Sequence, residues 1–220
     1  MTVATVLRSG GAYGPEYVDA LRRGVNRYLR GHRFLCLSDT PVGIWGEPLA
    51  HEWPGWWAKV ELFRPGLFDG LVLYLDLDTL VVGPLEWATT YAGQLAVLGD
   101  LFQDPNGTRR TMIGSGVMLF RPGPHTEAIY EAFTREPEVI MSQHTARSDY
   151  WYKRVMPDPD RIQAFYPGMV ESSKREAKDG APDGCSLVCA HGRPRLHEPR
   201  AGWAHRLWSE RAFAHRARAA

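Results

Sequence analysis

Cysteine is scarce in this sequence, and long apolar runs are missing. The three cysteines, Cys36, Cys185 and Cys189, are too few for a disulfide framework. No apolar run approaches the roughly 20 residues that span a bilayer, and the first residues show no basic leader followed by a long apolar stretch. We therefore expect a soluble protein of a reducing compartment, the cytoplasm, with no transmembrane segment.

An excess of one charge is missing as well. Lys and Arg number 26 against 25 Asp and Glu, which argues against a partner bound mainly by bulk charge, such as duplex nucleic acid or an anionic membrane. With 220 residues and 44% hydrophobic content, the chain can bury a sizeable core. We expect one domain over residues 1–220 and no nucleic-acid partner.

The order of the predicted elements indicates an α/β fold. A short strand over residues 3–10 is followed by a helix over residues 15–31, with Pro15 near its first turn, and by a strand over residues 34–39. A strand, a helix and a strand with short joints form a parallel pair with a crossover. The beginning of the chain therefore predicts a layered α/β architecture.

The rest of the chain continues this alternation. Further helices are predicted over residues 55–65, 125–138, 148–156 and 202–219, and further strands over residues 71–78, 95–100, 116–123 and 186–192. The strand at 71–78 is apolar on both faces, which is typical of a central parallel strand. We predict a mostly parallel central sheet with helices on both faces.

Two carboxylates stand at the end of this apolar strand. Asp76 and Asp78 lie one residue apart in LYLDLDTL, at the sheet edge where α/β proteins bind ligands. Alternate strand residues lie about 6–7 Å apart on one side, so both side chains can converge on one cation if the chain turns there. A divalent metal removes the cost of two adjacent anions, and oxygen ligands favour Mg²⁺ or Mn²⁺ with phosphate oxygens. The alternative is that Asp76 caps a turn and Asp78 faces water.

Several classes of protein fit such a site. A nucleotide-sugar glycosyltransferase holds a metal diphosphate with D-x-D. A phosphatase of the haloacid dehalogenase type also carries an aspartyl nucleophile after an apolar strand, although usually the first of its domain, and Leu80 stands where Thr or Val would follow. A nucleotidyltransferase needs an Arg-containing, Gly-rich loop that RSGGAYGP does not provide. A carbohydrate-binding module would use the eight tryptophans but gives no reason for the two carboxylates.

The block GWWAKVELFRPGLFDGLVLYLDLDTLVVGPL resembles the core of GT-A glycosyltransferases, specifically the retaining, glycogenin-like and galactosyltransferase-like group (family 8). In that group a helix with a basic residue precedes an apolar strand that ends in D-x-D and continues T-L-V. Lys59 matches the basic residue, Asp76 and Asp78 match the metal ligands, and Leu77 between them is assigned to the donor site. The resemblance implies a single GT-A type, Rossmann-like domain. The alternative for Lys59 is a side chain that extends from an amphipathic helix to solvent.

The resemblance assigns further residues to the donor. In family members the first strand ends beneath the nucleotide base, here at Leu7, and a following Tyr that matches Tyr13 stacks on the base. The alternative for Tyr13 is packing on the next helix. The segment SGVMLFRPG resembles the segment that lines the donor sugar, with Ser115 where Asn is usual and Gly116 after it. A plain strand entry is the alternative there.

Two later segments complete the resemblance. SDYWYKRV resembles D-Q-D-x-x-N near the reacting sugar, so Asp149 is a candidate catalytic residue, although it could instead cap a helix. CAHGRPRLHE resembles H-x-x-G-x-x-K-P-W, which implies His191 as the third metal ligand and places Gly192 and Arg195 at the diphosphate. His197 stands where the family has Lys, and Arg195 could be a solvated surface side chain.

A zinc site formed by Cys185 and Cys189 with nearby histidines is disfavoured by distance. An extended strand would separate the two cysteines by about 13 Å, whereas zinc ligands lie roughly 2.0–2.3 Å from one ion. Buried core cysteines are the better interpretation. The turn-rich segment GDLFQDPNGTRRTMIGSG, with Arg109 and Arg110, is either a lid over the donor or a hairpin with no role.

These patterns predict a metal-dependent glycosyltransferase, with Asp149 and Lys59 as candidate catalytic residues. It would use Mn²⁺ or Mg²⁺ to move a sugar from a nucleotide diphosphate donor, such as a UDP-sugar, to the hydroxyl of a carbohydrate or other acceptor. Retention of the anomeric configuration is implied by the resemblance alone. The sequence leaves the donor sugar, the base, the acceptor and the oligomeric state open.

Overall fold

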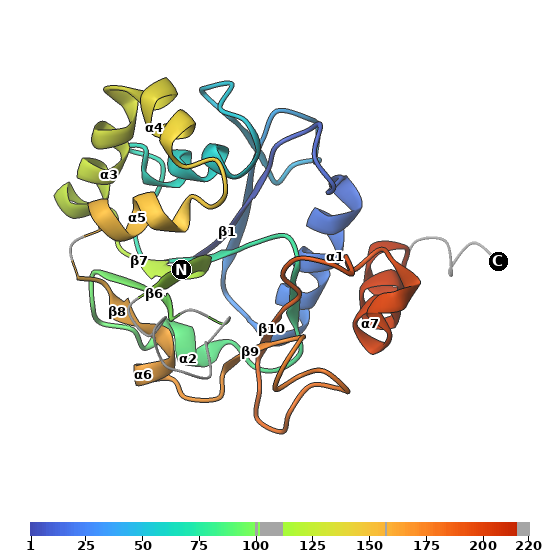
Figure 1. The fold of residues 1–220 in the computed structure, drawn as a ribbon. Coiled ribbons are helices and arrows are strands. Elements are labelled where there is room, and N and C mark those ends of the chain that lie inside the picture. Colours follow the sequence, from blue (N-terminus) through green and yellow to red (C-terminus); the bar gives the residue numbers. More distant parts are fainter. Residues whose placement is uncertain (100, 102–111, 157, 215–220) are drawn as a thin grey trace.

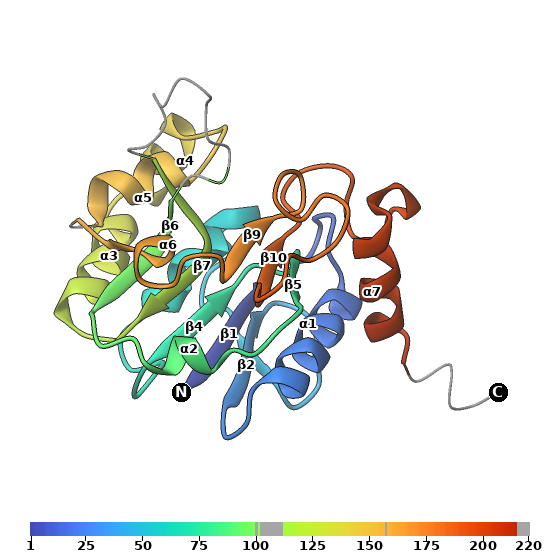
Figure 2. The ribbon, with the colours of Figure 1, turned by 90° about the horizontal axis from the view of Figure 1, so that it is seen from below.

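The structure is a computed structural model that describes residues 1–99, 101, 112–156 and 158–214. Its centre is a seven-stranded sheet in the order β3-β2-β1-β4-β7-β6-β8. In that order the strands are β3 (Gly46–Pro48), β2 (Arg33–Ser38), β1 (Thr2–Leu7), β4 (Val72–Leu75), β7 (Ile113–Phe120), β6 (Leu95–Gly99) and β8 (Asp160–Arg161). Figures 1 and 2 show this sheet from two directions.

The central sheet is mostly parallel, as predicted. Strand β1 pairs in parallel with β2 and with β4, β2 pairs in parallel with β3, and β6 pairs in parallel with β8. Strand β7 runs antiparallel to both β4 and β6. The carboxyl ends of β1 and β4 therefore meet at one edge of the sheet, beside the amino-terminal half of β7.

Helices cover both faces of this sheet. They are α1 (Pro15–Tyr28), η1 (Gly55–Phe63), α2 (Glu86–Thr89), α3 (Pro124–Thr134), α4 (Pro137–Gln143), α5 (Asp149–Val155), α6 (Ile162–Phe165), η2 (Pro199–Ala201) and α7 (Trp203–Ala212). Figures 1 and 2 show α1 and α7 on one side of the sheet and α3, α4 and α5 on the other. The predicted α/β class with helices on both faces is confirmed.

Each face of the sheet has its own hydrophobic core. On β4, Leu73 and Leu75 enter the core that contains α1 and α7, whereas Val72 and Tyr74 enter the core that contains η1, α3 and α5. All of these side chains are buried, since successive residues of a strand point to opposite faces. A strand between two cores must be apolar throughout, which explains why β4 lacks polar alternation.

A second, three-stranded sheet begins directly after Asp78. Its order is β5-β10-β9, with β5 (Thr79–Val81), β10 (Leu187–Cys189) and β9 (Val170–Ser172). Strand β10 pairs antiparallel with β5 and parallel with β9. The tripeptide from Asp76 to Asp78 therefore joins the two sheets and belongs to neither of them.

Several elements differ from the sequence prediction. The segment expected as a helix over residues 55–65 is a 3-10 helix, η1. The helix expected over residues 125–138 is split into α3 and α4, because Pro137 lacks an amide hydrogen and begins a new helix. Helix α7 ends at Ala212 rather than at residue 219. In the part of the chain that the structure describes, no helix has the length and apolar character needed to cross a membrane.

Candidate functional site

Two adjoining hollows meet where β4 ends. The β7 hollow, of about 230 Å³, is lined by Ser115 and Gly116 of β7 together with Asp149 and His191. The β1 hollow, of about 400 Å³, is lined by the end of β1 and by Tyr13 and Arg195. Their shared lining residues are Trp56, Lys59, Asp76 and Asp78. Residues far apart in the sequence thus surround one bipartite cavity.

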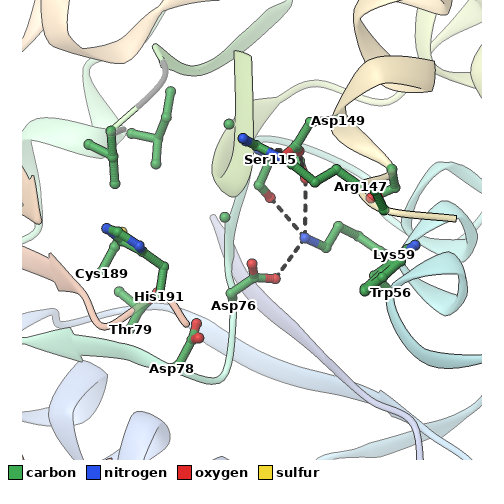
Figure 3. A pocket seen from close by; sticks show the side chains of 16 residues that line it. Trp56, Lys59, Asp76, Asp78, Thr79, Ser115, Arg147, Asp149, Cys189 and His191 are labelled. Carbon is green, nitrogen blue, oxygen red and sulfur yellow. Dashed lines mark hydrogen bonds and ion pairs between the residues drawn. The ribbon is translucent and has the colours of Figure 1, made fainter. Parts of the chain in front are cut away.

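Asp76 is held by the central sheet and by Lys59. Its backbone N–H donates to the carbonyl of Gly116 at 2.8 Å. Its Oδ1 lies 2.8 Å from Lys59 Nζ, and the Tyr74 hydroxyl donates to the same oxygen. Figure 3 shows Lys59 between Asp76 and Ser115, whose carbonyl and hydroxyl oxygens lie 3.2 and 3.3 Å from Nζ. Lys59 is only 6% exposed, so it does not extend to solvent.

Asp78 faces the β1 hollow. The Tyr13 hydroxyl donates to its Oδ2 at 2.8 Å, and Arg195 Nη1 lies 3.8 Å from the same oxygen. Burial and then the negative charge of Asp76 raise the pKa of the Asp78 carboxyl from 3.8 to about 6. The end of β4 therefore places two carboxylates close together, and the cations Lys59 and Arg195 offset their repulsion only in part.

Tyr13 lies between Tyr17 of α1 and Arg195 and contacts both of them. Its ring centroid lies 4.7 Å from that of Tyr17 in α1, and the Arg195 guanidinium lies 5.1 Å from the ring and donates to its hydroxyl. Burial, with the charge of Asp78, raises the pKa of the Tyr13 hydroxyl. The alternative of packing on the following helix is thus observed, and stacking on a nucleotide base stays a prediction. The Arg195 side chain is 28% exposed and contacts Tyr13 and Asp78 at the wall of the β1 hollow, so it is not a freely solvated surface arginine.

Asp149 is tied to β7 and to Arg147. Its Oδ1 accepts from the Ser115 amide at 3.1 Å and from the Ser115 hydroxyl at 2.6 Å, and its Oδ2 lies 2.9 Å from Arg147 Nη2. Asp149 is the first residue of α5, and Ser148, not Asp149, is the N-cap residue. The carboxylate therefore fixes the edge of the β7 hollow rather than capping its own helix.

His191 follows β10 and lines the same hollow as Asp76 and Asp78. Its Nε2 lies 2.8 Å from the Ser172 hydroxyl at the end of β9. Figure 3 shows His191 across the hollow from Lys59, beside Cys189. The small sheet thus contributes one imidazole to the site.

The three predicted metal ligands line one cavity and are of the types that a divalent cation accepts, namely two carboxylates and an imidazole. In their present arrangement they do not converge: among the described residues, no three His, Cys, Asp or Glu side chains are placed to hold a metal ion. Asp76 is bonded to Lys59, Asp78 to Tyr13, and His191 to a serine. The donor set fits a cation chemically, but binding one would require these side chains to exchange partners.

The remaining predicted residues differ in their relation to the two hollows. Leu7 and Leu77 line the β1 hollow. Gly116 lies so close to the site that a Cβ there would be 3.2 Å from Asp76 Oδ2. Gly192, with φ of 75°, lines neither hollow. The predicted lid segment, with its two arginines at 109 and 110, lies largely outside the described residues.

Among the site residues that sequence reasoning missed are Trp56 and Arg147. Trp56 lines both hollows and is 46% exposed, so its ring forms part of their rim. Arg147 pairs with Asp149 two residues later. A basic residue so near a candidate catalytic carboxylate was a usable signal for Arg147. Nothing in the sequence separated Trp56 from its buried neighbour Trp57.

No known sequence family and no curated protein matches this sequence. Solved structures do match its fold. A crystal structure of an active-site mutant of LgtC superposes with a TM-score of 0.69 at 14% identity, covering 97% of this chain and 96% of that chain. Galactosyltransferase LgtC in complex with donor and acceptor sugar analogs gives 0.61 at 15% identity, with the same coverage.

A third match is the glycosyltransferase GlyE of Streptococcus pneumoniae, with a TM-score of 0.66 at 14% identity. It covers 96% of this chain but 60% of GlyE. At these identities the likeness concerns the arrangement of the backbone, and it confirms the predicted GT-A type α/β fold.

Proposed function

We propose that this chain is a glycosyltransferase that moves a sugar from a nucleotide diphosphate donor, a UDP-sugar in the first instance, to an acceptor hydroxyl. The observation that carries the proposal is the pair of carboxylates at the end of β4, Asp76 and Asp78, shared by two adjoining hollows. Glycosyltransferases with this fold support it. These matches favour a glycosyltransferase over a phosphatase. The position of the carboxylates agrees, because the nucleophile of the phosphatase usually follows the first strand of its domain, whereas Asp76 follows β4.

The bipartite cavity suits a two-part donor. The nucleoside would occupy the β1 hollow, against Leu7 and Tyr13, and the transferred sugar would occupy the β7 hollow, beside Ser115. The diphosphate would then lie at the junction of the hollows, where Asp76 and Asp78 are found. The two volumes together fall within the roughly 300–1,000 Å³ that is typical of small-molecule sites.

A divalent cation, Mn²⁺ or Mg²⁺, would be held by Asp76, Asp78 and His191. When bound, it would supply Lewis-acid stabilisation of charge on the departing diphosphate. This assignment requires Asp76 to loosen its ion pair with Lys59 and His191 to leave Ser172. The raised pKa of Asp78 supports it, because a nearby cation would relieve the cost of ionising this carboxyl.

Lys59 and Asp149 are the proposed catalytic residues. Lys59 Nζ lies at the junction, between Asp76 and Ser115, where a fixed cation stabilises the negative charge of a leaving diphosphate. The Asp149 carboxylate, oriented by Ser115 and Arg147, would face the sugar and position it for attack by the acceptor. Retention of configuration is part of the proposal, and the anomer of the product, observed by NMR, tests it.

The decisive experiment is thermal unfolding with a panel of nucleotides and nucleotide sugars, each with Mn²⁺ and with a chelator. A ligand at a hundredfold excess over its Kd raises the free energy of unfolding by about 2.7 kcal/mol. We expect such stabilisation by a nucleotide diphosphate in the presence of metal, and its loss in Asp78→Ala. The matched control is Asp69→Ala, which removes an exposed carboxylate that lies before β4 and lines neither hollow.

Two results would contradict the proposal. One is the absence of any nucleotide response, together with metal-dependent phosphate release from simple phosphate esters. The other is a response that survives in Asp78→Ala but is lost in Asp69→Ala, which would place the nucleotide outside the two hollows.

A further inference from the structure

A third hollow, of about 560 Å³, lies beside the start of α7 and is distinct from the two described above. We call it the basic hollow. Its charged lining residues are five cations, Lys174, Lys178, Arg193, Arg200 and Arg206, and one carboxylate, Asp179. The whole chain has a formal net charge of +1, whereas the lining of this hollow has five cations against one carboxylate.

Few carboxylates compensate these cations. Arg193 Nη1 lies 3.4 Å and Arg200 Nη2 lies 3.0 Å from the carboxylate of Glu198, so two guanidinium groups share one anion. Lys174, Lys178 and Arg206 make no ion pair with any other residue that the structure describes. Like charges held around one concave surface repel one another, and an anion placed among them relieves this repulsion.

The basic hollow adjoins the segment that follows β10 and contains His191. Ala190 forms part of its wall, whereas Cys189 and His191 line the β7 hollow. The Ser172 hydroxyl connects the two places, because it accepts from the Lys174 amide at 3.2 Å and lies 2.8 Å from His191 Nε2. Figure 2 shows the segment between β9 and β10 next to α7, and both supply lining residues of the hollow. None of its lining residues lines either of the other two hollows.

We propose that the basic hollow binds a phosphate group, either a phosphomonoester or a diphosphate. Guanidinium groups match phosphate oxygens with paired hydrogen bonds, and lysine ammonium groups add charge without fixed geometry. The volume of about 560 Å³ suits one small phosphorylated group. A duplex nucleic acid would require a long basic stripe, and this hollow is local. The phosphate belongs either to a soluble molecule or to a lipid headgroup, and the recognising chemistry is the same.

The test is calorimetric titration of the full chain with pyrophosphate at constant ionic strength, with a chelator and without any sugar donor. We expect the Lys178→Gln/Arg206→Gln variant to weaken binding by about tenfold or more, because each substitution removes a charge-assisted contact. The control Arg135→Gln/Lys153→Gln removes two charges from exposed positions on the α3 and α5 side and should bind as the wild type does. Pyrophosphate bound at the junction of the other two hollows would be unaffected by either double variant, so only a loss confined to Lys178→Gln/Arg206→Gln reports on the basic hollow.

A parallel arm separates the two sources of phosphate. Co-sedimentation with vesicles of phosphatidic acid, compared with phosphatidylcholine vesicles, detects a headgroup, and competition by pyrophosphate links that binding to the same hollow. The proposal is overturned if neither pyrophosphate nor phosphatidic acid binds, or if the Lys178→Gln/Arg206→Gln variant and the surface control lose binding equally. Unfolding midpoints of all variants verify the fold. The inference does not depend on the proposed transfer activity, because no donor or metal is present.

Discussion

Replacing Asp78 with asparagine should stabilise this protein and abolish the nucleotide diphosphate binding proposed above. Asp78 is largely buried, its side chain being 14% exposed, and Asp76 lies two residues before it. Its ionised form is therefore unfavourable, which appears as a pKa raised from 3.8 to about 6. Asparagine has nearly the same shape, can accept the hydrogen bond from the Tyr13 hydroxyl, and carries no charge.

The size of the effect follows from the pKa difference. A shift from 3.8 to about 6 corresponds to about 3 kcal/mol at roughly 1.4 kcal/mol per unit. The attraction of Arg195, 3.8 Å away, lowers this pKa and is already contained in the net shift. We expect the free energy of unfolding at pH 8 to rise by about 1–3 kcal/mol, or roughly 2–10 °C in Tm for a chain of this length.

The sign of the pH dependence provides an independent check. A carboxyl with a raised folded-state pKa binds its proton more tightly in the folded than in the unfolded protein. Its contribution to stability is complete below the unfolded value of 3.8 and is lost as the pH rises through the folded value of about 6. The wild type should therefore lose stability relative to Asp78→Asn across this window, and the difference should be constant above it.

The assay is urea unfolding of both proteins from pH 4 to pH 8 without metal, followed by the nucleotide panel with Mn²⁺. A variant that is less stable than the wild type at pH 8, or a stability difference that does not change with pH, would refute the argument that a desolvated charge at Asp78 strains the fold. Asp69→Asn, at an exposed position, is the control and should change neither quantity.

Three other substitutions test the fold and the site. Lys59→Met leaves the Asp76 carboxylate without its ion pair and should lower kcat/KM of sugar transfer by about 10²–10³-fold. Steady-state kinetics would measure this loss, and Lys59→Arg, which keeps the charge, should restore part of the activity. Asp149→Asn removes the ion pair that orients this side chain and should lower kcat, while the Kd for UDP stays within about twofold of the wild-type value. If a titration showed that UDP affinity falls by as large a factor as kcat, Asp149 would not act near the sugar. Gly83→Ala should destabilise the chain by about 1–3 kcal/mol, because the new Cβ would lie 2.5 Å from the carbonyl oxygen of Cys185, and an unchanged urea midpoint would contradict this packing.

The central part of the fold was predictable because its signals are local. Strand β4 is apolar on both faces, and helix α1 has a proline at its start and buried residues at helical spacing. The break at Pro137 was also available from the sequence, since proline ends a helix in a known way. The small sheet was not predictable, because its three-residue strands carry too few residues to show a period and are defined only by their long-range partners.

In the candidate site, too, local patterns were predictable from the sequence and long-range contacts were not. Asp76 and Asp78 follow from a pattern within eight residues, whereas the Ser115–Asp149 contact and the Ser172–His191 contact join segments that only the tertiary fold brings together. Sequence reasoning named both Ser115 and Asp149 of the first pair, but only His191 of the second. It could not name the contact, because no local pattern encodes which loop will meet which strand end.

Because the candidate site lies at the junction between the two sheets, its integrity depends on the local stability of both sheets. Asp76 is fixed to the large sheet through its amide and Gly116, whereas the carbonyl of Asp78 accepts from the amide of Ala190 beside β10. Sub-global opening of the small sheet would move Asp78 and His191 away while Asp76 stayed in place, so the site would disassemble at a lower free energy than the core. In hydrogen exchange, amides of β5 and β10 should therefore lose protection before those of β4, and a ligand that bridges Asp76 and Asp78 should make the two sheets exchange as one unit.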